Sequence, residues 1–385
     1  MQQWAERLSG GKPGLALPAR VRRIASLVFL GVFPVLTVVA LFASAIESDS
    51  VAMDLRQFLG AAEAILGGDS PYLPPGEPLT EWGGPYPYPP LPALLAIPLI
   101  PLSFQTAGLL VMATLVVVAL AIPWVLGVRD WRCYGLLLLW PPVISAIQTA
   151  NVTLWFALFA AISWRFRDRL VPVTVTIGVT LAAKFFLWPI VIWLAATRRI
   201  ATAVATCVVG ALLVVLSWSV IGFAGFLDYP DLVRRLEDVV GDDSYTLYIV
   251  GLDLGLPSTA ARLIWVAVGL ALLAWTVLLG RRGDERSAFM VAIAASLALS
   301  PIVWLHYFAL LLVVVALAER RLSAVWFVPL AMVMTPGSGH PTPFETAATL
   351  AIATLTIALA LRASLSMARA EPSGAVSTPL TVRAA

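Results

Sequence analysis

Three ionisable side chains lie within or at the end of strongly apolar segments, and each could take part in chemistry. Asp54 comes directly after a long apolar segment, near the start of the stretch MDLRQFLGAAEAILGGDSPY. Lys184 lies within AAKFFLWPIVIW, and His306 lies within SPIVWLHYF. A carboxylate can act as a general base when it is within hydrogen-bond reach of the proton that it removes. A lysine or a histidine can bind an anionic group such as a phosphate.

Each of these residues also has a purely structural interpretation. An acid at the start of a helix, such as Asp54, is stabilised by the helix dipole and by the free amides of the first turn. Lys184 could belong to an ion pair, although a lysine deep in a membrane costs about 2.5–3.5 kcal/mol on insertion scales. His306 follows a Ser-Pro helix break and could be a hydrogen-bonded polar residue without a catalytic role. For Lys184 we favour the binding of an anion, with a lipid phosphate as the natural candidate.

Further polar side chains interrupt or border the apolar runs. Gln148 and Asn151, in SAIQTANVTLW, either satisfy a helix break or hydrogen-bond a ligand. Tyr88, in the Pro-rich stretch GGPYPYPPLPALLAIPL, fits an interfacial aromatic belt better than a stacking platform. Asp243 follows a second amphipathic segment. Polar groups that converge on one face typically form a single site, and we expect Tyr88, Gln148 and Asp243 to join Asp54, Lys184 and His306.

The composition places these residues in a membrane protein. Hydrophobic residues make up 60% of the 385 residues, charged residues only 12%, and the mean hydropathy is +0.91. These values predict an all-α polytopic membrane protein, because helices satisfy their own backbone hydrogen bonds in lipid. The apolar runs predict about 12 transmembrane segments. Several runs are shorter than the ~20 residues that a span needs, which indicates helices broken around an internal cavity.

One transmembrane domain is predicted over residues 24–362. A cytoplasmic segment, 1–23, precedes it, and a disordered cytoplasmic tail, 363–385, follows it. Two outer loops, 47–87 and 222–258, each carry an amphipathic helix of the kind that lies in a membrane interface. No cluster of metal-ligating residues is visible in the sequence, so we expect no metal site.

The basic residues predict the orientation. Most of the 25 Lys and Arg residues fall in the N-terminal segment, in alternate loops and in the tail, as is typical of cytoplasmic segments. This distribution places the polar residues above on the extracytoplasmic side. The same side holds Arg56, Arg234, Arg235 and Arg262, whereas Arg129 and Arg132 are ambiguous.

The order and spacing of five motifs resemble those of bacterial membrane glycosyltransferases of family 87. The motifs are MDLRQFLGAAEAILGGDSPY, YPYPPLPALLAIPL, QTANVTLWFALF, LAAKFFLWPIVIWLAATRR and SPIVWLHYFALLL, and the resemblance covers roughly residues 24–360. It implies a GT-C-like fold in the plasma membrane. It also implies inverting transfer of a hexose, with mannose as the expected sugar. The donor would be polyprenyl-phosphate-mannose, and the acceptor a lipid-linked molecule or a glycan on the outer face.

The resemblance also implies roles for individual residues. Asp54 corresponds to the acid in the first outer loop of the family, which is the expected general base. The donor is a substrate, so no cofactor is implied. Lys184 and His306, with Arg262 as a further candidate, are expected to bind the donor phosphate. The sugar or the acceptor is expected to contact Tyr88, Gln148, Asn151 and Asp243.

Two departures from the family pattern concern the sugar and the acceptor more than the fold. Thr149-Ala150 stands where Gly-Gln is expected before the amide at 151, and DDSY at 242–245 stands where an Asn-Gln-Ser pattern is expected. A GT-C enzyme that uses polyprenyl-phosphate arabinose or glucose would look much the same.

Two functions of other classes compete with glycosyl transfer. A transporter or flippase of lipid-linked sugars would also need a polar cavity and Lys184. It would not account for two outer amphipathic helices, and the chain has no internal repeat of the kind common in transporters. A non-catalytic membrane scaffold is disfavoured because charge inside a membrane is costly.

Overall fold

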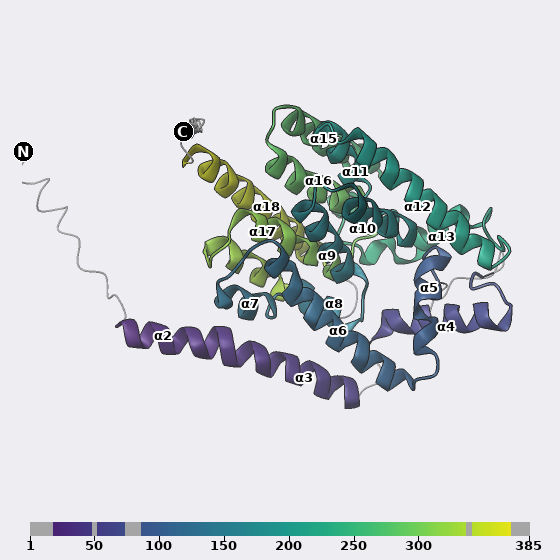
Figure 1. Cartoon of the computed structure of the whole chain (residues 1–385), viewed down its shortest axis with the longest axis horizontal. Coiled ribbons are helices and arrows are strands. Elements are labelled where there is room, and N and C mark those ends of the chain that lie inside the picture. The colour runs from purple at the N-terminus through teal and green to yellow at the C-terminus, as the bar shows by residue number, and fades with distance from the viewer. Residues whose placement is uncertain (1–17, 48–51, 74–85, 336–340, 371–385) are drawn as a thin grey trace, which may run out of the picture.

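Every regular element in the described part of the chain is helical (Figure 1). This confirms the predicted all-α class. Parts of the predicted N-terminal segment, the C-terminal tail and the loop 47–87 lie outside the described residues. The computed structural model describes residues 18–47, 52–73, 86–335 and 341–370.

Five helices are long and apolar enough to cross a membrane, and they coincide with apolar segments predicted from the sequence. The first is continuous through a π-helical turn, η1 (Val28–Val32), which joins its two α-helical parts. The five are α2 (Ala19–Leu27) with α3 (Phe33–Glu47), α6 (Phe104–Val125), α12 (Ile200–Val220), α15 (Ser258–Arg281) and α18 (Pro343–Ala370).

The remaining apolar segments form shorter or bent helices. A sixth span results if the bent pair α8 (Pro141–Gln148) and α9 (Thr153–Arg165) is counted as one. A helix with fewer than ~20 residues does not reach across a membrane by itself, so the predicted number of about 12 crossings stays a prediction. The shorter apolar helices are α5 (Pro90–Ala96) with η2 (Ile97–Leu99), α10 (Leu170–Ala183), η4 (Leu305–Leu310) with α17 (Leu311–Ala318), and η5 (Ala324–Met334).

Three helix breaks lie on one side of the bundle. α8 and α9 meet at 119°, and Ala150 between them has a left-handed φ of 57°. α10 ends at Ala183 and is capped by Lys184. α11 (Pro189–Ala196) begins with a proline, which is favoured at a first helical position because it lacks an N–H. α16 (Glu285–Leu299) is capped by Ser300, before η4. The sequence predicted all three interruptions.

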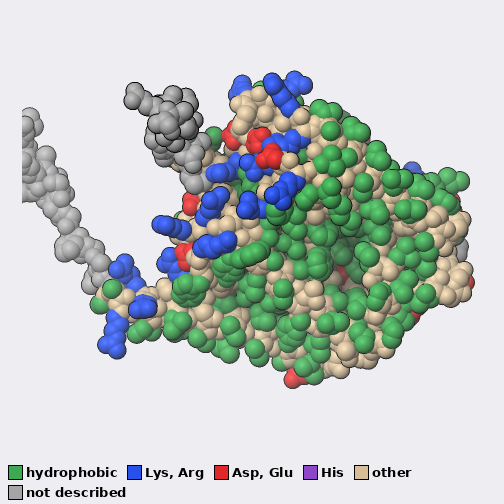
Figure 2. Space-filling view, viewed as in Figure 1, with side chains coloured by type: hydrophobic (Ala, Val, Ile, Leu, Met, Phe, Trp, Pro, Cys, Tyr) green, Lys and Arg blue, Asp and Glu red, His purple; other side chains and the backbone are tan. Residues whose placement is uncertain are grey.

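The other ends of α9, α10 and α16 are held together by ion pairs. Glu285 accepts hydrogen bonds from Arg199 at 2.9 Å and from Arg167 at 3.1 Å, and Arg199 also pairs with Asp168 at 2.6 Å. We call these four residues the ion-pair cluster. Figure 2 shows Lys and Arg side chains gathered on this side of the molecule, from the start of α2 to the turn between α15 and α16, while apolar side chains cover most of the remaining face.

The two arginines that the sequence left ambiguous lie at this same basic end. Arg132, in α7 (Trp131–Leu137), bonds to the Asp130 carboxylate at 2.7 Å. The same carboxylate accepts a hydrogen bond from the backbone N–H of Leu322 at 3.0 Å. Leu322 directly follows Arg320 and Arg321 in the sequence. The basic loops of the described chain therefore share one end of the bundle.

The centre of the bundle is formed by α17, whose eight residues are all buried. A helix that is apolar on every side is expected in the interior, and α17 packs against α6, α9 and α18. Small residues allow close helix contacts elsewhere. An added Cβ at Gly135 in α7 would lie 1.7 Å from the carbonyl oxygen of Leu30 in η1, so this glycine permits the first helix to dock.

Two amphipathic helices occur where the sequence predicted them. α4 (Met53–Gly67) buries Leu55, Phe58 and Leu59 on one face. α13 (Tyr229–Val240) follows α12 and leads through η3 (Gly241–Asp243) to α14 (Leu247–Asp253). In Figure 1, α4, α5 and α13 lie on the side away from the basic end. Their placement outside the membrane stays a prediction.

Candidate functional site

Asp54 is positioned by the contact between the start of α4 and the end of α8. Ala52 has a left-handed φ of 61°, and its N–H donates to the carbonyl of Gln148 at 2.8 Å. The N–H of Asp54 donates to the carbonyl of Thr149 at 3.0 Å. Free amides at the start of one helix thus pair with free carbonyls at the end of another. Asp54 lies in the first turn, where the helix dipole favours an acid, but its side chain is not the cap of α4.

The Asp54 carboxylate is held by Asn151, from the break between α8 and α9. Asn151 Nδ2 donates to Asp54 Oδ2 at 2.6 Å. The amide oxygen of Asn151 accepts from the N–H of Thr153 at 2.8 Å and from its hydroxyl at 2.6 Å. Because both ends of the amide are engaged, the buried Asn151 side chain has one orientation and places the carboxylate firmly.

Lys184 faces this carboxylate from the break between α10 and α11. Its ammonium donates a hydrogen bond to the hydroxyl of Tyr307. It also lies over the rings of Tyr307 and Tyr88, at 4.2 and 5.1 Å from their centroids, where cation–π attraction is expected. The charges of Lys184 and Asp54 attract each other. The site therefore combines a carboxylate and an ammonium group, each carried by a helix break or a helix start.

His306 and Tyr307 enter the site from η4, just after the break that follows α16. His306 is only 6% exposed, its ring lies 4.9 Å from that of Tyr307, and no hydrogen-bond partner of its Nε2 occurs among the described residues. A buried polar atom without a protein partner is typical of a place where a ligand or water binds.

Tyr88 borders the site on the side where its ring faces the Lys184 ammonium. Its ring is buried and lies 5.0 Å from that of Phe58 in α4. Its backbone carbonyl accepts a hydrogen bond from the hydroxyl of Tyr72 at 3.0 Å. Five residues thus form what we call the central cluster, which consists of Asp54, Tyr88, Asn151, Lys184 and Tyr307.

Three residues predicted for the site have other described contacts. Gln148 contributes its backbone carbonyl, while its side chain is exposed. Arg262, in α15, lies over the ring of Tyr248 in α14, at 5.4 Å. Asp243 lies in η3, and this segment is tied to the break before His306 because Ser244 Oγ accepts from the N–H of Val303 at 2.7 Å. Their proposed roles in binding stay predictions.

Tyr307 is the member of the central cluster that sequence reasoning missed. It directly follows His306 in the sequence, and its part in the site depends on its contact with Lys184. Asp54 and Lys184 are partly exposed, whereas the tyrosines and Asn151 are buried. A bound molecule would therefore reach the carboxylate and the ammonium first.

The environment of Asp54 affects its protonation in two opposing ways. Burial raises the pKa of the Asp54 carboxyl, while the hydrogen bond from Asn151 and the charge of Lys184 lower it. The net direction is upward from 3.8, because removal from water dominates. A carboxylate with a raised pKa is a stronger base than a free one, so the site is suited to accept a proton from a hydroxyl.

Groups of three or more His, Cys, Asp or Glu side chains that could hold a metal ion do not occur within the described residues. The central cluster provides one carboxylate, one amide, one ammonium and two phenols. Such a set can bind an anion and remove a proton. The prediction that no metal is needed remains to be tested.

A family model described as Glycosyltransferase family 87 matches residues 86–303, more than half of the chain. The matched range contains Tyr88, Asn151 and Lys184. Asp54 precedes it, and Tyr307 follows it. No curated protein and no solved structure matches the chain.

Proposed function

The chain belongs to glycosyltransferase family 87, and from this premise we propose that it transfers a hexose from a polyprenyl-phosphate sugar to a lipid-linked or glycan acceptor. It is a multi-pass membrane glycosyltransferase. We propose mannose as the sugar, polyprenyl-phosphate-mannose as the donor, and the outer face of a bacterial plasma membrane as the place of reaction. The fold is proposed to be GT-C-like.

The observation that carries this proposal is the pairing of Asp54 with Asn151 opposite Lys184. In the proposed reaction, an acceptor hydroxyl oxygen attacks the anomeric carbon, and the bond from that carbon to the phosphate oxygen breaks. Asp54 takes the proton of the hydroxyl. Inversion follows because the base and the leaving group lie on opposite faces of the sugar ring.

The leaving phosphate gains negative charge as the bond breaks, so it needs a cation more than an acid. Lys184 is proposed to supply this charge, because preorganised charges aimed at developing charge stabilise a transition state. Tyr307 would orient the ammonium through their hydrogen bond. The open Nε2 of His306 is proposed to bind another phosphate oxygen, with Arg262 as a more distant candidate.

The remaining predicted site residues are proposed to contact the sugar or the acceptor. The phenol of Tyr88 lies beside both charged groups, and the amide of Asn151 lies beside the base. Gln148 is the last residue of α8, and Asp243 precedes Ser244, which is hydrogen-bonded to the break before His306, so both would act at the edge of the site. No cofactor or metal ion takes part in the proposed reaction.

The test is a transfer assay with protein purified in detergent. Labelled polyprenyl-phosphate-mannose and a lipid extract serve as donor and acceptor, and covalent transfer is measured. Asp54→Asn keeps the shape of the side chain and removes its basicity. We expect transfer to fall by at least about 10²-fold, in line with the usual contribution of a general base.

Glu63→Gln is the matched control, because Glu63 is an exposed acid on the same helix, α4. Its transfer rate should equal that of the wild type. Normal transfer by a well-folded Asp54→Asn variant would exclude Asp54 as the base. Movement of the donor lipid across vesicles without covalent transfer would favour a flippase.

A further inference from the structure

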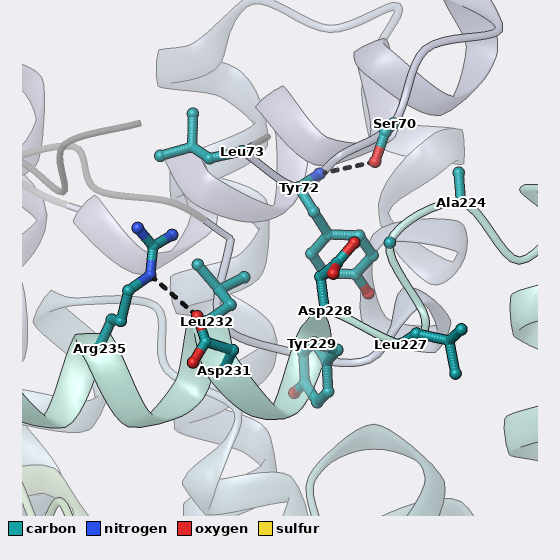
Figure 3. Close-up of a pocket in the computed structure, with 11 residues that line it drawn as sticks. Ser70, Tyr72, Leu73, Ala224, Leu227, Asp228, Tyr229, Asp231, Leu232 and Arg235 are labelled. Carbon is teal, nitrogen blue, oxygen red and sulfur yellow. Dashed lines mark hydrogen bonds and ion pairs between the residues drawn. The ribbon is translucent and has the colours of Figure 1, made fainter. Parts of the chain in front are cut away.

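A pocket of about 300 Å³ lies on the side of the molecule that carries α4, α5 and α13, outside the central cluster. One wall comes from residues directly after α4, including Ser70 and Tyr72. The other wall comes from the turn after α12 and from the first two turns of α13, including Asp228, Tyr229 and Arg235 (Figure 3). Its size is at the lower end of the range for pockets that bind small molecules.

The aromatic wall of this pocket is rigid. The ring of Tyr72 stacks on Trp218, with centroids 5.0 Å apart and planes 15° apart, and meets Tyr229 edge-on. Both phenol hydroxyls are engaged, because Tyr72 donates to the carbonyl of Tyr88 at 3.0 Å and Tyr229 donates to the carbonyl of Pro87 at 2.9 Å. Because each hydroxyl already donates its one proton, it can only accept a further hydrogen bond, and the rest of each ring presents apolar surface.

The rest of the lining combines apolar side chains, among them Leu73, Leu227 and Leu232, with charged side chains in which acids outnumber bases. Asp228 and Asp231 are exposed carboxylates, and Arg235 Nε lies 3.6 Å from Asp231 Oδ2. Carboxylates accept hydrogen bonds from hydroxyl groups. Asp231 is also paired with Arg234 outside the pocket, at 2.5 Å, so the pocket has no excess of positive charge to attract an anion such as a phosphate. Apolar ring faces beside hydroxyl-binding acids match a neutral polyhydroxy ring, which has C–H faces and O–H edges.

We propose that this pocket binds a neutral sugar residue of the acceptor, at a position remote from the hydroxyl that reacts. The acceptor role rests on the proposed glycosyl transfer. The aromatic wall and the central cluster share the segment 87–88, since Tyr72 and Tyr229 hold its carbonyls while Tyr88 lies under Lys184. A glycan of more than one sugar could therefore extend from Asp54 to the pocket, and the pocket would select acceptors that already carry sugar.

Binding is tested directly with the full chain in detergent by saturation-transfer NMR, using methyl glycosides of mannose, glucose and arabinose as probes. Two variants alter the pocket. Ala224→Trp fills it, and Asp228→Asn weakens a hydroxyl acceptor. The matched controls are Leu254→Trp and Asp253→Asn, at exposed positions at the end of α14. We expect the wild type and both controls to bind at least one glycoside, and Ala224→Trp to bind at least about tenfold more weakly.

The same variants are then compared in the transfer assay with a glycan acceptor. Ala224→Trp should raise the acceptor KM and leave the donor KM unchanged. Equal glycoside binding by Ala224→Trp and the wild type, or no binding by the wild type, would overturn the inference. Binding that requires added Ca²⁺ and is abolished by EDTA would identify a cation site and overturn it as well.

The outcome for the pocket is separate from the outcome for the reaction. Asp54→Asn should bind the glycoside as the wild type does, although its transfer rate is strongly reduced. Glycoside binding by a wild type that transfers nothing would leave the pocket standing and remove the proposed reaction. Normal transfer with an unchanged acceptor KM in Ala224→Trp would leave the proposed reaction standing and remove the pocket as an acceptor site.

Discussion

At the scale of single residues, the hydrogen bond from Asn151 to Asp54 controls how readily the carboxyl group takes up a proton. The bond favours the charged form of the acid, whereas burial favours the neutral form. A base acts only when it is deprotonated. Activity should therefore be present above the pKa of Asp54 and should fall as the pH drops through it.

The variant Asn151→Ala removes a cause that lowers the pKa of Asp54. The pKa should rise further, and the acid limb of kcat/KM against pH should move to higher pH. A hydrogen bond to a charged group contributes about 1.5–3 kcal/mol, so the expected shift is about one to two pH units. The measurement is the initial rate of transfer across a pH series at acceptor concentrations well below KM, where the rate is proportional to kcat/KM.

Thr153→Val is the control for this experiment. It removes one of the two hydrogen bonds to the amide oxygen of Asn151 and leaves the bond to Asp54. Its acid limb should match that of the wild type. If Asn151→Ala loses activity equally at every pH, Asn151 only supports the local structure.

The sequence indicated several members of the site and could not indicate their partners. Lys184 and His306 are rare polar residues in apolar surroundings, and Asp54 follows the end of an apolar segment. The bond between Asn151 and Asp54 joins positions 97 residues apart, and it depends on how α4 docks on α8. Tyr307 did not stand out, because its role comes from Lys184 and not from its own sequence context.

At the scale of helices, Gly135 in α7 allows the backbone of the first membrane helix to pack closely against α7. An added Cβ at Gly135 would overlap backbone atoms of Leu30, and backbone cannot move aside as a flexible side chain can. The first helix has few other contacts with the bundle, since its apolar side chains are mostly exposed. Its position therefore depends on this close approach.

Gly135→Ala should separate α7 from the first helix and destabilise the protein. Overpacking of this kind typically costs about 1–3 kcal/mol. The effect should appear as a lower thermal midpoint in detergent. Gly60→Ala is the control, because nothing lies within 4 Å of an added Cβ there, and its midpoint should be equal or higher. An unchanged midpoint for Gly135→Ala would show that the first helix does not depend on this contact.

Helix positions were predictable from apolar runs, and helix roles were not. The long segments and the three breaks follow from hydropathy, proline and polar residues. The number of membrane crossings does not follow from hydropathy. A short apolar run such as α17 has the same hydropathy pattern whether it crosses a membrane or is buried among other helices. That distinction depends on neighbours that lie far away in the sequence.

At the scale of the whole molecule, the chain has a basic end and an end that carries the central cluster and the pocket. The ion-pair cluster joins three loops at the basic end. Arg129 and Arg132 lie with them, so the asymmetry is stronger than the sequence alone indicated. Basic loops remain on the cytoplasmic side during insertion, which predicts an outward-facing site.

Labelling of single cysteines tests this orientation. In a chain whose Cys133 and Cys207 are replaced by alanine, Asp253→Cys and Arg282→Cys place one thiol at each end. A membrane-impermeant maleimide should label Asp253→Cys in intact bacterial cells and Arg282→Cys only after the cells are opened. The opposite pattern would place the central cluster in the cytoplasm.

The three helices between the two ends also set the depth at which the reaction takes place. α9, α10 and α16 have 13, 14 and 15 residues, and each runs from the ion-pair cluster to a helix break at the site. At 1.5 Å per residue they are about 20–22 Å long. A lipid hydrocarbon layer is about 30 Å thick. The polar head of a lipid donor would therefore have to lie roughly 10 Å below the membrane surface on the side of the site, unless the bilayer thins there. Water would then be scarce around the breaking bond. Low water activity at that depth would favour transfer to the acceptor over wasteful hydrolysis of the donor.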